Sequence, residues 1–146
     1  MTVYRKPFSR NLYAKYDAAA KEKLLQHLAI DGHTLVDAEE SFDADLVTRK
    51  DGEKHFSEAE VKTAWKGEWP TNWAEIRIPE RKKKLLSKHT NNLKFYIFSE
   101  DMSKAWCIDS KQLTDDKLKE ASGRNIYEGE QFYHVPYKEA QLINVA

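Results

Sequence analysis

The sequence of 146 residues contains a single cysteine, Cys107, which excludes an internal disulfide and any zinc site built from several cysteines. Its five glycines are not grouped, so the chain lacks the glycine-rich phosphate loop of nucleotide-driven enzymes. Apolar runs are only a few residues long, and the opening stretch "MTVYRKPFSRNLY" lacks the apolar segment of a secretory signal. These absences predict a cytoplasmic protein with no membrane segment and no nucleotide cofactor.

Net charge is also absent, because 24 basic residues balance 24 acidic ones. A neutral chain is not expected to bind nucleic acid through bulk charge alone. The charges are nevertheless separated: acidic residues concentrate in 37–60, and "RKKKLLSKH" forms a basic cluster at 81–89. A metal-dependent enzyme that acts on a polyanion needs such separate regions, although proteins without this function have them too.

The length predicts one domain over residues 1–146, with enough apolar residues for a single core. Residues 17–30 have the apolar spacing of a helix, with Asp17 as its N-cap and Gly32 as its end. Strands are expected at 33–38, 42–50 and 54–65, and the Asp-Gly pair within "KDGE" predicts a hairpin between the last two.

The second half of the chain alternates short strands with short helices. Strands are expected at 73–78 and 130–135, a hairpin at 92–98 and 104–108, and helices at 80–88 and 114–122. The order of these elements predicts an α/β domain with a mixed central sheet, rather than a bundle or a barrel.

The predicted strand 54–65 has an unusual set of charges. Ala59 and Val61 point to one face, so Glu58, Glu60 and Lys62 share the other. The hairpin pairs Asp45 near residue 58, and a bulge or slight shift would bring its carboxylate towards Glu60. Converging carboxylates repel each other unless a cation lies between them, and Mg²⁺ requires only one or two carboxylates. Glu58 competes with Glu60 as the second acid, and a solvated strand face with a cross-strand ion pair is the simpler alternative.

The pattern "ADLV" followed by "EVK" resembles the active-site signature of the PD-(D/E)xK, or restriction-endonuclease-like, nuclease superfamily. Ala44 stands where the proline of that signature would be. The short chain is similar to phage, homing or resolvase-type members, and the likeness covers roughly residues 17–100. It implies a restriction-endonuclease-like fold, in which helices flank the mixed sheet, and a Mg²⁺-dependent endonuclease for DNA that could also use Mn²⁺.

The resemblance also implies roles for individual residues. Asp45 and Glu60 would be metal ligands, together with the backbone carbonyl of Val61, and Lys62 would be the catalytic lysine. Many members add an acid from the first helix, for which Glu22 is the available candidate.

DNA would be held by basic residues that follow the site in the sequence, namely Arg77, Arg81, Lys82, Lys83 and Lys84. Trp65, Trp69 and Trp73 either stack on unpaired bases or close the edge of the core, which we favour for Trp73. One active site cuts one strand, so double-strand cleavage would require a homodimer or a higher homo-oligomer.

Two other functions agree with the same residues. One is a catalytically silent nucleic-acid-binding module, and the other is a protein-interaction domain whose charged strand is merely solvated. His27 and His33 are expected to be surface or capping residues, and Cys107 to be a buried core thiol.

Overall fold

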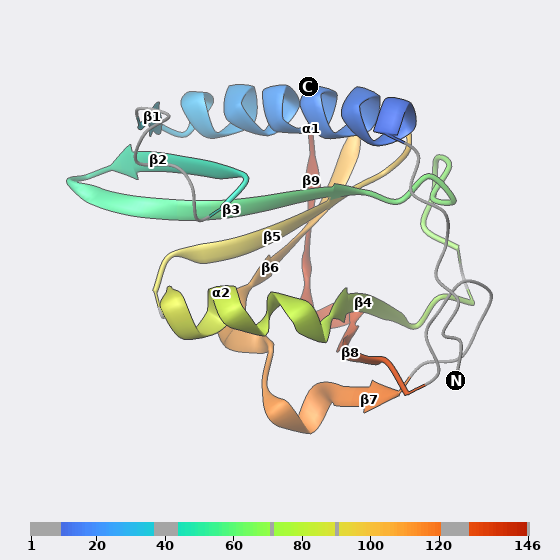
Figure 1. Cartoon of the computed structure of the whole chain (residues 1–146). Helices are drawn as coiled ribbons and strands as arrows, with labels where there is room; N and C mark the ends of the chain where they lie inside the picture. The colour runs from blue at the N-terminus through green and yellow to red at the C-terminus, as the bar shows by residue number, and fades with distance from the viewer. Residues whose placement is uncertain (1–9, 37–43, 71, 90, 121–128, 146) are drawn as a thin grey trace.

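The computed structural model describes residues 10–36, 44–70, 72–89, 91–120 and 129–145. Its centre is a six-stranded sheet whose strands follow the order β1 (Thr34–Leu35), β2 (Leu46–Lys50), β3 (Glu53–Val61), β5 (Leu93–Phe98), β6 (Lys104–Asp109) and β9 (Gln141–Asn144). β3 and β5 are parallel, and the other neighbours are antiparallel. The predicted α/β class with a mixed central sheet is therefore confirmed (Figure 1).

One face of this sheet is covered by the long helix α1 (Arg10–Ile30), which lies across it in Figure 1. Ala20, Leu24 and Leu28 are buried against the sheet, as their helical spacing predicts. The predicted end is confirmed, because the helix stops at Ile30 and Gly32 follows with a φ of +94°. The predicted start is wrong: Asp17 lies inside the helix and is not its N-cap. No helix in the described part of the chain is both long and apolar enough to cross a membrane.

A smaller sheet lies under the opposite face, with the order β4 (Glu75–Pro79), β8 (Gln131–Pro136) and β7 (Leu118–Glu120). After β4, the 3₁₀ turn η2 (Glu80–Lys82) leads into the short helix α2 (Lys83–Lys88). Figure 1 shows α2 and β4 on the side of the central sheet away from α1. Three more 3₁₀ turns connect strands: η3 (Ser110–Gln112), η4 (Asp115–Lys117) and η5 (Tyr137–Glu139).

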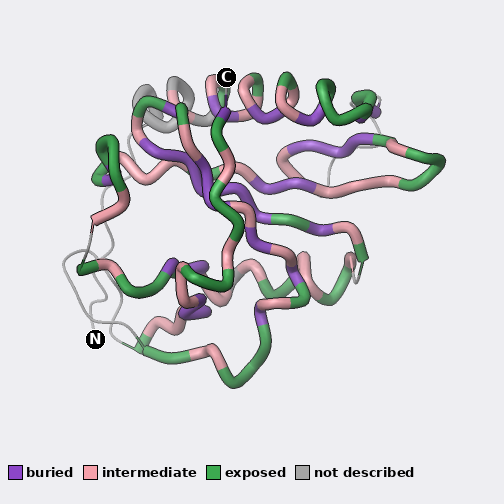
Figure 2. Tube along the Cα trace, turned by 180° about the vertical axis from the view of Figure 1, so that it is seen from behind, coloured by how far each residue is buried: buried purple, intermediate pink, exposed green. Residues whose placement is uncertain are grey.

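The core therefore has two layers, and the central sheet separates them. Between α1 and the sheet, Leu24 packs with Phe98 and Ala105. Between the two sheets, Trp65 and Ile76 belong to the second layer. The buried positions follow the central strands and one stripe of α1 in Figure 2. Each layer contains fully buried side chains, so both contribute to the hydrophobic stabilisation of the fold.

The hairpin of β2 and β3 forms where it was predicted. Lys50 pairs with Glu53, and the turn residues Asp51 and Gly52 have φ angles of 53° and 81°. Two successive positive φ angles are what a two-residue hairpin turn requires, and Asp-Gly adopts them readily. Ala59 and Val61 pack into the layer beneath α1. Glu58, Glu60 and Lys62 consequently belong to the opposite face, as the alternation predicts.

Two features of the second half differ from the predictions. Residues 114–122 were expected to form a helix, but they begin with the single turn η4 and continue as β7. Leu118 pairs with Tyr133 of β8 and packs on the core, so a distant strand overrides the local helical pattern. β9 was not predicted. Parts of the predicted strands at 33–38 and 42–50, and part of the predicted helix 114–122, lie outside the described residues.

Candidate metal centre

Two carboxylates come together where β2 begins. Leu46 pairs with Ser57, so Asp45 lies opposite Glu58. The Asp45 backbone N–H donates to Glu58 Oε2 over 2.7 Å, and the Ala59 N–H donates to Asp45 Oδ2 over 2.9 Å. Each acid therefore binds a backbone amide of the other strand. This reciprocal arrangement satisfies amide groups at the place where β2 begins, and it fixes the Asp45 side chain at the edge of β3.

Two lysines from other elements approach this pair. Lys82, at the end of η2, contacts Glu58 Oε1 at 2.8 Å, and Lys21 of α1 lies 3.8 Å from Asp45 Oδ1. Lys21 and Lys82 come from opposite faces of the central sheet. The site thus joins both layers of the molecule, and its geometry depends on the packing of each.

The charges on these carboxylates are not fully balanced. Burial, followed by the negative charge of Glu58, raises the pKa of Asp45 to about 6. The Ala59 amide and the two lysines act in the opposite direction but do not cancel this effect on the pKa. An acid with a raised pKa beside a second acid marks a place where further positive charge would be stabilised.

Glu60 follows Glu58 on the same face of β3, and Lys62 comes directly after Val61, where this strand ends. The Glu60 side chain is exposed, and that of Lys62 is half-buried. The Lys62 N–H donates to the Phe98 carbonyl over 2.9 Å, which holds the end of this strand against β5. Glu58 is 8% exposed, and its two carboxylate oxygens accept hydrogen bonds from the Asp45 N–H and from Lys82. Glu58 is therefore less free than the exposed Glu60 to bind a ligand.

The Val61 carbonyl is the remaining predicted ligand. Backbone groups of residues two apart point to the same side of a strand. The Ala59 N–H points to Asp45, which lies on the β2 side of β3. The backbone groups of Val61 therefore point to the same side of β3, at a position that β2 does not reach because it begins at Leu46. Its carbonyl is thus directed to the same edge of β3 as Asp45.

The structure does not bring Glu22 to this place. Glu22 is exposed, and its position on α1 lies about 200° around the helix from Ala20 and Leu24, which face the sheet. The α1 residue that reaches Asp45 is its neighbour Lys21. The sequence alone gave no signal for this contact, because it depends on how α1 lies across the sheet.

The predicted DNA-contacting residues are divided between two environments. Arg77 on β4 and Lys83 and Lys84 on α2 are exposed. Lys82 is instead engaged with Glu58. Arg81 lies in η2, and its side chain is outside what the structure describes.

The tryptophans belong mainly to the core. Trp65 is fully buried, whereas Trp69 and Trp73 are half-buried against the layer between the two sheets. The rings of Trp65 and Trp69 meet edge to face at a centroid distance of 5.0 Å. The core interpretation favoured for Trp73 is confirmed, and it extends to Trp65.

Within the described residues, no three histidine, cysteine, aspartate or glutamate side chains form a group that could hold a metal ion. Mg²⁺ requires fewer protein ligands, because it binds through one or two carboxylates and takes its other ligands from water and phosphate. Asp45, Glu60 and the Val61 carbonyl offer oxygen atoms of the hard kind that Mg²⁺ binds, whereas the contacts that Asp45 makes in the described residues are with Glu58, the Ala59 amide and Lys21. No protein-family model matches this chain, and no curated protein sequence matches it.

Proposed function

We propose that this chain is a Mg²⁺-dependent endonuclease that hydrolyses phosphodiester bonds in DNA, with a restriction-endonuclease-like fold. The observation that supports this proposal most directly is the position of Asp45. Its carboxylate is bound to the Ala59 amide, between the positions of Glu58 and Glu60 on β3, and its pKa is raised to about 6. Although this carboxylate satisfies the Ala59 amide, its ionised form opposes folding at neutral pH, which supports a role for it besides stability.

The two glutamates have different roles in this proposal. Glu58 positions Asp45 through the Asp45 N–H, and Lys82 balances its charge. Glu60 is exposed and has no recorded partner among the described residues, so it supplies the second metal-binding carboxylate. The Val61 carbonyl supplies the third oxygen.

The catalytic chemistry follows from these groups. When bound, Mg²⁺ polarises a phosphate oxygen and lowers the pKa of an attacking water. Lys62 lies two residues beyond Glu60 on the same strand face, where its ammonium group orients that water and stabilises negative charge that develops on the phosphate. Asp45 and Glu60 would hold the cation, and this would set the position of the reacting phosphate relative to Lys62.

The DNA backbone would be bound by basic residues on the side of the sheet away from α1. Lys83 and Lys84 follow Lys82, whose contact with Glu58 brings this segment next to the site. Arg77 lies on β4 just before it. Each phosphate contact adds salt-dependent affinity. Cleavage of both strands would require a homodimer or a higher homo-oligomer.

The test is incubation of supercoiled plasmid with the protein and Mg²⁺ or Mn²⁺. The parent is expected to nick the plasmid only with metal, and Asp45→Asn, Glu60→Gln and Lys62→Met to reduce the rate at least about 100-fold. Glu120→Gln, an exposed acid on β7, is the matched control. Cleavage that survives in all three site variants would contradict the proposal. Salt-sensitive DNA binding without cleavage would indicate the silent module, and absence of both activities the protein-interaction domain.

A further inference from the structure

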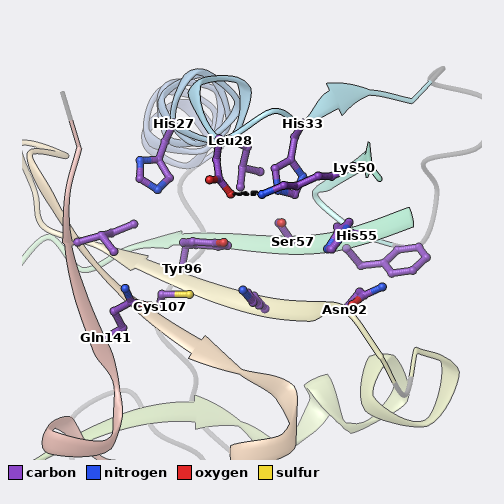
Figure 3. Close-up of a pocket in the computed structure, with 14 residues that line it drawn as sticks. His27, Leu28, His33, Lys50, His55, Ser57, Asn92, Tyr96, Cys107 and Gln141 are labelled. Atoms are coloured by element: carbon purple, nitrogen blue, oxygen red, sulfur yellow. Dashed lines mark hydrogen bonds and ion pairs between the residues drawn. The ribbon is translucent and has the colours of Figure 1, made fainter. Parts of the chain in front are cut away.

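A cavity of about 340 Å³ lies on the α1 side of the central sheet, near the C-terminal end of that helix. Figure 3 shows His27 and Leu28 above it and Tyr96 and Cys107 on the strands below. The expectation that Cys107 is a buried core thiol is confirmed only in part, since its side chain packs against the core beneath α1 but is partly exposed and lines this cavity. The cavity is large enough for a small organic molecule.

The polar lining is predominantly basic. Three histidines and two lysines face the cavity, namely His27, His33, His55, Lys50 and Lys94. Asp31 is the one acid among the described residues of the lining, and its carboxylate pairs with Lys50 at 2.9 Å. The dashed line in Figure 3 marks this ion pair. Asp31 Oδ2 also lies 3.8 Å from His33 Nε2, so His27, His55 and Lys94 are the basic groups of the described lining that form no ion pair with this acid.

Two of the histidines are close together. The rings of His33 and His55 meet edge to face at 4.9 Å, and His33 Nδ1 lies 2.8 Å from the Thr48 hydroxyl. His33 is buried, so the expectation of a surface residue is wrong, but the expected capping role is confirmed, because its backbone N–H donates to the Leu28 carbonyl at the end of α1 over 3.0 Å. Burial, together with the positive charges of His55 and Lys50, lowers the pKa of His33. Because the described lining offers more basic than acidic side chains, the cavity is suited to an anionic ligand.

We propose that this cavity binds a phosphate group, with Lys94 and His55 as its principal donors. A phosphate monoester has several oxygens and a charge between −1.5 and −2 near neutral pH, which suits donors that come from separate strands. The volume beyond the phosphate, lined by Leu28, Tyr96 and Ile143, accommodates an attached organic group. The shared chemistry is the phosphate, whether it belongs to a free ester or to DNA. The ligand that the shape favours is a free ester of mononucleotide size.

The site does not depend on the proposed nuclease. His55 and Ser57 are on the α1 face of β3, whereas Glu58, Glu60 and Lys62 are on the other. Asp45→Asn should consequently leave phosphate binding unchanged while it abolishes cleavage. The two proposals can therefore fail separately.

The experiment follows the Cε1–H signals of all five histidines by NMR at constant pH, while the intact protein is titrated with inorganic phosphate, deoxyadenosine monophosphate or a DNA duplex without terminal phosphates. His134, which does not line the cavity, is the internal reference; His89 is not used as one, because its ring stacks on Phe56 of the lining. We expect saturable shifts of His27, His33 and His55 with the mononucleotide. Lys94→Ala and His55→Ala should each weaken binding about tenfold. Lys119→Ala, which removes an exposed lysine of β7, should not.

Each outcome decides the assignment. Shifts with the mononucleotide but not with the duplex support a free ester. Shifts with the duplex alone would assign the phosphate to DNA and overturn the free ester. Absence of saturable shifts with any of the three probes, or binding that Lys94→Ala and His55→Ala leave unchanged, would overturn the site itself.

Discussion

Replacement of Asp45 by asparagine should stabilise the protein at alkaline pH. The pKa of the Asp45 carboxyl group is about 6 in the folded protein, whereas that of an ordinary aspartate is 3.8, so the folded state disfavours the ionised form. This group therefore lowers stability above pH 6, and stability is regained as the pH falls from 6 towards 3.8. The difference of about two units between these pKa values corresponds to a loss of ~3 kcal/mol in the free energy of unfolding at pH 8 and of less than ~1 kcal/mol at pH 4.

Asparagine retains an oxygen that accepts the Ala59 N–H, but it removes the charge that Glu58 repels. The assay is urea denaturation followed by circular dichroism, with chelator present, at pH 8 and pH 4. Asp45→Asn should gain up to ~3 kcal/mol at pH 8 and little at pH 4. Asp51→Asn, in the exposed hairpin turn, is the control and should show no such gain. A variant that loses stability at pH 8, or gains the same amount at both pH values, would refute the reasoning.

Three other perturbations test the surroundings of the site. Lys82→Ala leaves Glu58 buried without its ion pair and should lower the free energy of unfolding in urea by about 1–3 kcal/mol. Adding Glu58→Gln to the same chain should partly restore that stability. Equal losses in the single and double variants would contradict this pairing. Leu24→Ala empties a fully buried position beneath α1 and should cost about 2–5 kcal/mol in the same assay; a loss below ~1 kcal/mol would mean that α1 does not pack there. Glu22→Gln should leave plasmid cleavage unchanged, because this side chain is exposed on α1; a large loss of rate would show that the helix turns towards the site.

Local patterns predicted the parts of the fold that depend on neighbouring residues. The Asp-Gly turn set the register of β2 and β3, which placed Asp45 opposite Glu58, and the alternation along β3 separated Ala59 and Val61 from the charged residues. These two inferences predicted that Asp45 and Glu58 lie together, which the pairing of the strands and the hydrogen bond from the Asp45 N–H to Glu58 confirm.

Contacts between distant elements could not be predicted in this way. Lys82 reaches Glu58 across 24 residues, and it was expected to contact DNA because it belongs to a basic run. The lining of the cavity comes from α1, the β2–β3 hairpin, β5, β6 and β9, so only the assembled sheet brings its histidines and lysines together. β7 was mistaken for part of a helix because its short sequence gains its strand conformation from pairing with β8.

Calorimetric titration of the protein with Mn²⁺ at pH 8 tests most directly whether Asp45 and Glu60 form a divalent-cation site. We expect one ion to bind per chain, with binding lost in Asp45→Asn and Glu60→Gln and retained in Glu22→Gln. Glu58→Gln should weaken binding without abolishing it, because Glu58 acts through the position of Asp45. Absence of binding to the parent, or equal binding by the parent and both ligand variants, would contradict the metal centre.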